Sequence, residues 1–143
     1  MNVRKTVMLI LASICSSQYA AAEGVPSTWL CSDLNRGTYM GAPDWSVKED
    51  GQADQVLLVE YKGKNVGHIS WFKRKKKYYD SPAIAVEMNS GIAFSVYGDE
   101  FLESYVLNVS TSEIFFTSIR SGSSSLPNAV KSFRGTCVGA GNN

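Results

Sequence analysis

Two cysteines, Cys31 and Cys137, constrain the fold of this chain most strongly, because they stand near the two ends of its patterned region. Nearly every candidate strand lies between them, so a bond joining them would enclose the domain in one covalent loop. In the chain-entropy model, a disulfide that closes a loop of that length stabilises the folded protein by roughly 4–5 kcal/mol. A redox pair or half of a metal site would need C-x-x-C spacing or clustered histidines, and neither occurs. We therefore predict a structural disulfide.

Residues 1–22 have the pattern of a cleaved signal peptide. A basic start precedes a short apolar run, and Ala20 and Ala22 complete an A-x-A cleavage pattern before Glu23. The apolar run is about half the length that a membrane helix needs, so no retained transmembrane anchor is expected. The protein is predicted to be exported through a bacterial-type signal, to the periplasm or the medium.

Removal of this segment leaves a single predicted domain, 23–143, whose last residues, 139–143, should form a flexible tail. Cys15 is lost, so the remaining cysteine count is even, as a disulfide in an oxidising compartment requires. The formal charge changes from +1 to −1, because two basic residues and no acidic residue are removed. A near-neutral domain makes nucleic acid an unfavoured partner.

The mature chain alternates apolar and polar residues with a period of two, which is typical of half-buried strands. About eight such segments are joined mostly by short turns, which favours an antiparallel meander. We predict an all-β fold, a small closed or nearly closed barrel, with a two-layer sandwich as the alternative. A loop is expected over 120–128 and one helical turn over 129–132. The aromatic residues expected in the core are Trp29, Trp45, Trp71, Phe94 and Phe133, with Trp45 and Val47 pointing inward from a strand over 44–48.

The most conspicuous local feature is the basic-aromatic segment, 71–79. Seven of the basic residues of the mature chain fall between positions 62 and 77. Adjacent cations beside aromatic rings can hold phosphates, acidic glycans or lipid head groups. The alternative is a solvated hairpin tip, or lysines that protect a strand edge from aggregation. The candidate ligand-binding residues are Lys73, Arg74, Lys75, Lys76, Lys77, Tyr78 and Tyr79.

The sequence predicts no catalytic site, metal site or cofactor. His68 is the only histidine, and Ser70 has the same strand facing, which does not suit a nucleophile and its base. No G-x-S-x-G, H-E-x-x-H, P-loop or dinucleotide motif occurs. An alternative from another class is a small secreted hydrolase, in which Glu60, Glu87 and Glu103 would converge at a barrel mouth.

A secreted small barrel with Trp29 near its first strand and Arg134 near its last resembles the lipocalin architecture. The G-x-W motif of that family is absent, because Gly24 and Trp29 are too far apart. The resemblance is one of architecture, and it implies a carrier of a small apolar ligand.

The sequence favours a non-catalytic exported binding or interaction protein. Its expected partner is an anionic polymer, a cell-envelope surface or another protein, such as an enzyme to be inhibited. The basic-aromatic segment is the surface expected to meet that partner.

Overall fold

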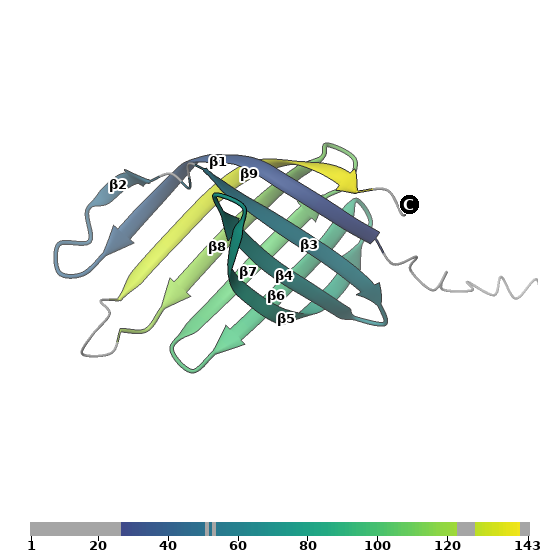
Figure 1. Cartoon of the computed structure of the whole chain (residues 1–143). Coiled ribbons are helices and arrows are strands. Elements are labelled where there is room, and N and C mark those ends of the chain that lie inside the picture. The colour runs from purple at the N-terminus through teal and green to yellow at the C-terminus, as the bar shows by residue number, and fades with distance from the viewer. Residues whose placement is uncertain (1–26, 51, 53, 123–127, 141–143) are drawn as a thin grey trace, which may run out of the picture.

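The computed structural model describes residues 27–50, 52, 54–122 and 128–140, and these form nine antiparallel strands (Figure 1). The predicted signal peptide and most of the predicted loop over 120–128 lie outside the described residues. The strands are β1 (Ser27–Gly41), β2 (Val47–Asp50), β3 (Gln55–Gly63), β4 (Val66–Lys73), β5 (Lys76–Met88), β6 (Gly91–Gly98), β7 (Phe101–Asn108), β8 (Glu113–Arg120) and β9 (Ala129–Ala140).

Eight of these strands close into a barrel. From β3 to β9 each strand pairs with the next, and β1 pairs with β3 on one side and with β9 on the other. The short strand β2 pairs only with the far part of β1, so it projects beyond the closed ring (Figure 1). The predicted antiparallel meander and closed barrel are therefore confirmed, and the two-layer alternative is not what forms.

The disulfide fastens the seam of the barrel. Cys31 on β1 and Cys137 on β9 are directly opposite each other in the register, and their sulfurs are bonded. Both cysteines are buried. The prediction that the bond joins the first and last strands is confirmed, and a disulfide is compatible with an exported protein.

Side chains fill the barrel interior as one continuous apolar cluster. Aromatic rings form its centre: the centroid of Phe116 lies 5.5 Å from Trp71, 4.7 Å from Tyr105 and 5.7 Å from Phe133. The predictions of Trp71, Phe94 and Phe133 as core residues are confirmed, and Trp29 packs against the cluster while only partly buried.

Trp45 and Val47 are not in the core, so that prediction was wrong. Trp45 is 47% exposed and Val47 is 66% exposed. The chain turns after β1, where the amide of Trp45 donates to the carbonyl of Gly41 and Trp45 has a left-handed φ of 51°. The strand that follows begins only at Val47 and lies outside the ring, so it has no interior to face.

The expected helical turn over 129–132 is also wrong, because β9 begins at Ala129. These residues pair with β8 on one side and with the end of β1 on the other. Ladder hydrogen bonds to two neighbours override the weak local preference for a turn. At its other end β9 continues through Gly139 and Ala140, which pair with Trp29 and Thr28. The flexible tail predicted over 139–143 is therefore wrong for its first two residues, and 141–143 lie outside the described residues.

Candidate functional site

The β4–β5 hairpin carries the basic-aromatic segment at one end of the barrel. Lys73 and Lys76 are paired across the hairpin, and the two residues between them, Arg74 and Lys75, have φ values of 50° and 67°. Positive φ at both central residues defines a type I′ turn, for which Asn-Gly is the preferred sequence. The turn therefore places two cations where the backbone favours asparagine and glycine.

Four of the predicted cations are exposed and have no acidic partner among the described residues: Lys73, Arg74, Lys75 and Lys76. Lys77 differs, because its Nζ lies 3.0 Å from Oδ2 of Asp80. The tip of the hairpin thus presents a compact, uncompensated positive charge to solvent.

The two tyrosines of the segment point in different directions. A register shift after Trp71 places Tyr79 opposite Trp71, so Tyr79 faces the barrel interior and donates to Glu103 Oε2 at 3.0 Å. Tyr78 is exposed and its hydroxyl donates to the side chain of Gln55. The structure brings Lys73, Arg74, Lys76 and Tyr78 together at the hairpin tip, and Tyr78 also lines the mouth pocket that Tyr79 faces.

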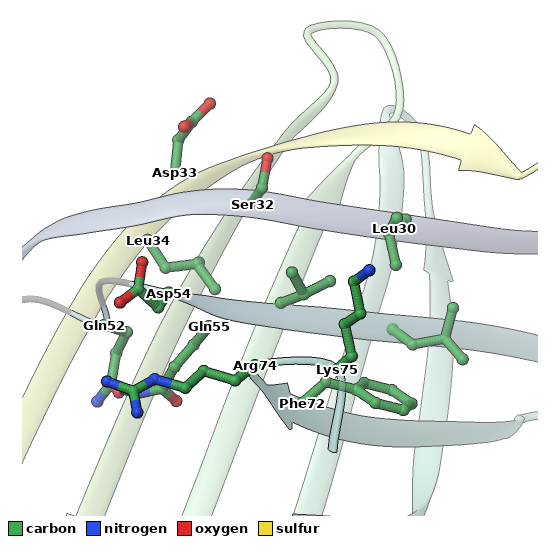
Figure 2. Close-up of a pocket in the computed structure, with 12 residues that line it drawn as sticks. Leu30, Ser32, Asp33, Leu34, Gln52, Asp54, Gln55, Phe72, Arg74 and Lys75 are labelled. Carbon is green, nitrogen blue, oxygen red and sulfur yellow. Dashed lines mark hydrogen bonds between the residues drawn. The ribbon is translucent and has the colours of Figure 1, made fainter. Parts of the chain in front are cut away.

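An open pocket of about 1050 Å³ lies between this hairpin and the outer faces of β1 and β3. Figure 2 shows Arg74 and Lys75 extending from the hairpin into the pocket, with Phe72 beside Lys75. Apolar residues form much of its wall, and two carboxylates also line it. The apolar wall residues are Leu30, Leu34, Val56, Leu58 and Phe72, and the carboxylates are Asp33 and Asp54.

A serine, a histidine and an aspartate meet on the outer face of β4 and β5, but not in the order of a catalytic triad. Oδ1 of Asp80 accepts a hydrogen bond from Ser70 Oγ at 2.6 Å and lies 2.7 Å from His68 Nε2. In a triad the histidine stands between the serine and the acid. Here the serine donates directly to the carboxylate, so no base is placed to activate it. These bonds, with Ser70 first, then Lys77 and His68, hold the pKa of Asp80 well below its usual range.

A second polar cluster lies inside the barrel mouth, at the same end as the hairpin. Tyr105 donates to Glu103 Oε2 at 2.7 Å, and the indole N–H of Trp71 donates to the Tyr105 hydroxyl at 3.1 Å. Burial, and then the charge of Glu103, raise the pKa values of Tyr79 and Tyr105. A pocket of about 140 Å³ opens beside this cluster.

The three glutamates named in the hydrolase alternative do not converge. Glu60 lies on the outer face of β3 opposite His68, and Glu87 lies near the far end of β5, where its proximity raises the pKa of Tyr61. Only Glu103 lines the mouth pocket. The period-two pattern held a signal for its position, because Glu103 shares the inward face of β7 with Phe101 and Tyr105.

A comparison of the chain with protein-family models, curated proteins and solved structures found no match. Within the described residues, no helix is long and apolar enough to cross a membrane.

Proposed function

We propose that this protein is an exported, non-catalytic binding protein whose β4–β5 hairpin docks onto an anionic surface of the cell envelope. It would act in the periplasm or outside the cell. The observation that carries this proposal is the uncompensated charge of Lys73, Arg74, Lys75 and Lys76 at the hairpin tip. Each basic residue near an anionic membrane surface contributes about 1 kcal/mol of attraction.

The left-handed backbone at the hairpin tip favours a binding role for the segment over the alternative of a solvated turn without a function. A left-handed φ costs a residue with a side chain about 1 kcal/mol relative to glycine. Arg74 and Lys75 both bear this cost, although a turn selected for stability alone would use Asn-Gly. The conformational cost of two cations at these positions is explained if their positive charge contributes to binding.

The outer pocket indicates what kind of anion fits. Arg74 and Lys75 border the same pocket as the apolar side chains of Leu30, Leu58 and Phe72. A partner that combines an anionic head with an apolar portion would satisfy both chemistries at once. Because Asp33 and Asp54 also line the pocket, its head is assigned to the side of Arg74 and Lys75. We therefore assign an anionic amphiphile, such as an acidic phospholipid head group with the start of its chains, as the partner.

The test replaces the strained turn by its preferred sequence, in the variant R74N/K75G. Its free energy of unfolding should rise by about 1–2 kcal/mol, because the left-handed positions are relieved. Its binding to vesicles containing phosphatidylglycerol should weaken about 30-fold, because two charges are removed. Co-sedimentation at low salt measures the binding, and urea denaturation measures the stability.

The β3–β4 turn supplies a matched control. Lys64 and Asn65 also have left-handed φ values, 52° and 62°, but this turn lies at the opposite end of the barrel. K64N/N65G should stabilise the protein with vesicle binding unchanged, whereas the single-charge variant Arg74→Asn should weaken binding about fivefold.

Equal binding to neutral phosphatidylcholine vesicles, or binding that does not weaken between low and high salt, would contradict the proposal. Binding to a soluble polyanion such as heparin without any binding to vesicles would contradict the amphiphile assignment.

A further inference from the structure

The mouth pocket has an internal order that follows from the strand register. Glu103 on β7 is directly opposite Ser118 on β8, and both line the pocket. Phe101 and Arg120 form the next inward-facing pair, two residues nearer the open end of the barrel. The carboxylate therefore lies about 7 Å deeper along the strands than the backbone of the arginine.

The deep part of the pocket holds a carboxylate that makes no ion pair among the described residues, although Lys131, opposite Ser118 on β9, also lines the pocket. Glu103 is 7% exposed, and both hydrogen bonds to its Oε2 come from uncharged tyrosine hydroxyls. It forms no ion pair with any lysine, arginine or histidine in the described part of the chain. A buried charge of this kind is ordinarily paired.

Ser118 supplies an independent observation that points to a ligand. The residue is 2% exposed, and no protein group of the described residues hydrogen-bonds to its buried Oγ. Such a group costs about 1–3 kcal/mol when nothing satisfies it. Since Ser118 lines the pocket opposite Glu103, one bound donor could reach both groups.

The remaining walls set the size and the polarity of what fits. Trp71, Tyr79 and Phe116 enclose the deep part, and aromatic faces attract cations. At the rim stands the exposed guanidinium of Arg120, which makes no ion pair with a carboxylate of the described residues. A volume of about 140 Å³ is close to that of a cavity known to hold a molecule of about six heavy atoms.

We propose that this pocket binds a small zwitterion of the amino acid class, with its ammonium group on Glu103 and Ser118 and its carboxylate at Arg120. A simple anion would be repelled by the carboxylate of Glu103. A simple cation would gain no attraction from the guanidinium of Arg120. A molecule with both charges a few ångströms apart matches the deep carboxylate and the rim guanidinium together. The site is separate from the hairpin tip and does not depend on the proposed envelope binding.

Isothermal titration of the full mature protein with L-alanine tests this inference. Ethylamine lacks the carboxylate and propionate lacks the ammonium group, so they serve as matched probes. Alanine should bind at least about tenfold more tightly than ethylamine, and propionate should not bind. An absence of alanine binding at millimolar concentration would overturn the proposal, and so would equal affinity for ethylamine and alanine.

Three variants locate the ligand. Glu103→Gln keeps an oxygen for Tyr79 and Tyr105 to donate to, yet should weaken alanine binding about tenfold or more through loss of the charge. Arg120→Gln lies at the exposed rim, so it should leave the fold intact while reducing the preference for alanine over ethylamine. Unchanged alanine affinity in both variants would overturn the assignment.

Ser118→Ala separates a ligand contact from a structural role. Removing an unsatisfied buried hydroxyl should raise the thermal unfolding midpoint of the free protein, yet weaken alanine binding about fivefold. Ser104→Ala, at an outward-facing position of the neighbouring strand, is the control and should change neither measurement. A stabilised Ser118→Ala protein that binds alanine as well as the parent would count against the contact.

Discussion

Asp80 and Glu103 each collect several hydrogen bonds, but they lie on opposite faces of the barrel wall. Asp80 is on the outside of β5 and is surrounded by Ser70, His68 and Lys77. Glu103 is on the inside of β7, and Tyr79 and Tyr105 donate to it. The outer carboxylate has a full ammonium partner, whereas the inner one has only hydroxyl groups.

The difference shows why one cluster is complete and the other is suited to binding. Outside the barrel, a lysine can reach a carboxylate while its charged end stays in water. Inside, Lys131 lines the same pocket as Glu103, but the two form no ion pair, and desolvating a lysine to form one would cost several kcal/mol. The proposed ligand would therefore meet a carboxylate that no side chain of the described residues pairs with.

Truncation of Glu103 should give the largest effect in this comparison. Glu103→Ala leaves the buried Tyr105 hydroxyl and the partly buried Tyr79 hydroxyl without their acceptor, so the free energy of unfolding should fall by about 2–4 kcal/mol. Asp80→Ala should cost less, because His68 and Lys77 reach water and only the buried Ser70 hydroxyl is left without its acceptor. Urea denaturation of both variants measures the difference, and an equal loss in the two would break the comparison.

The dependence of the unfolding free energy on pH in the alkaline range should reflect the Glu103 cluster inside the barrel. Folded-state pKa values of Tyr79 and Tyr105 are raised, so the folded protein holds phenolic protons that the unfolded chain releases above about pH 10. The resulting stability is fully present below that pH and is lost as the pH rises further. Tyr79→Phe should reduce the slope of the unfolding free energy above pH 10 by about one proton. An unchanged slope would contradict the raised pKa of Tyr79 and its interaction with Glu103.

The dependence of the unfolding free energy on pH in the acidic range should reflect the Asp80 cluster on the outside of the barrel. This effect should be the smallest of the three. The folded-state pKa of Asp80 is lowered, so its contribution is present above the unfolded value of about 3.9 and is lost as the pH falls. Asp80→Asn should therefore flatten the dependence of stability on pH below about pH 4. Lys77→Gln should flatten it less, because Ser70 is the larger cause of the shift. A steeper acid dependence in Asp80→Asn would reverse this reading.

Strand β5 shows what the alternating pattern can and cannot predict: it identifies the two faces of a strand, but not which face is buried. Its sequence places Ile84, Val86 and Met88 on one face, and the pattern alone would assign that face to the core. The structure turns them outward, each more than 40% exposed, and buries Ala83 and Ala85 instead. Phe94 occupies the interior nearby, and close packing leaves room there only for small side chains.

The exposure of Trp45 and the partners of Glu103 escaped prediction for the same physical reason. A local pattern gives the two faces of a strand, but whether a face meets an interior depends on the ring that distant strands close. Trp45 lies outside that ring and is exposed, whereas Glu103 lies inside it beside the indole and phenols of other strands. No local signal ties Glu103 to Ser118 or Tyr79, because they meet only across strands.

The sequence by itself determined the disulfide seam, the antiparallel meander and the cationic hairpin, because each depends on residue type and short-range order. Cys31 and Cys137 needed only the first and last strands to meet, and Lys73 to Lys76 needed only a short turn. The tertiary structure alone decided which carboxylate is buried with tyrosine hydroxyls as its donors and which buried hydroxyl has no partner among the described residues. Both outcomes follow from closure of the barrel, which removes water from side chains that are distant in the sequence.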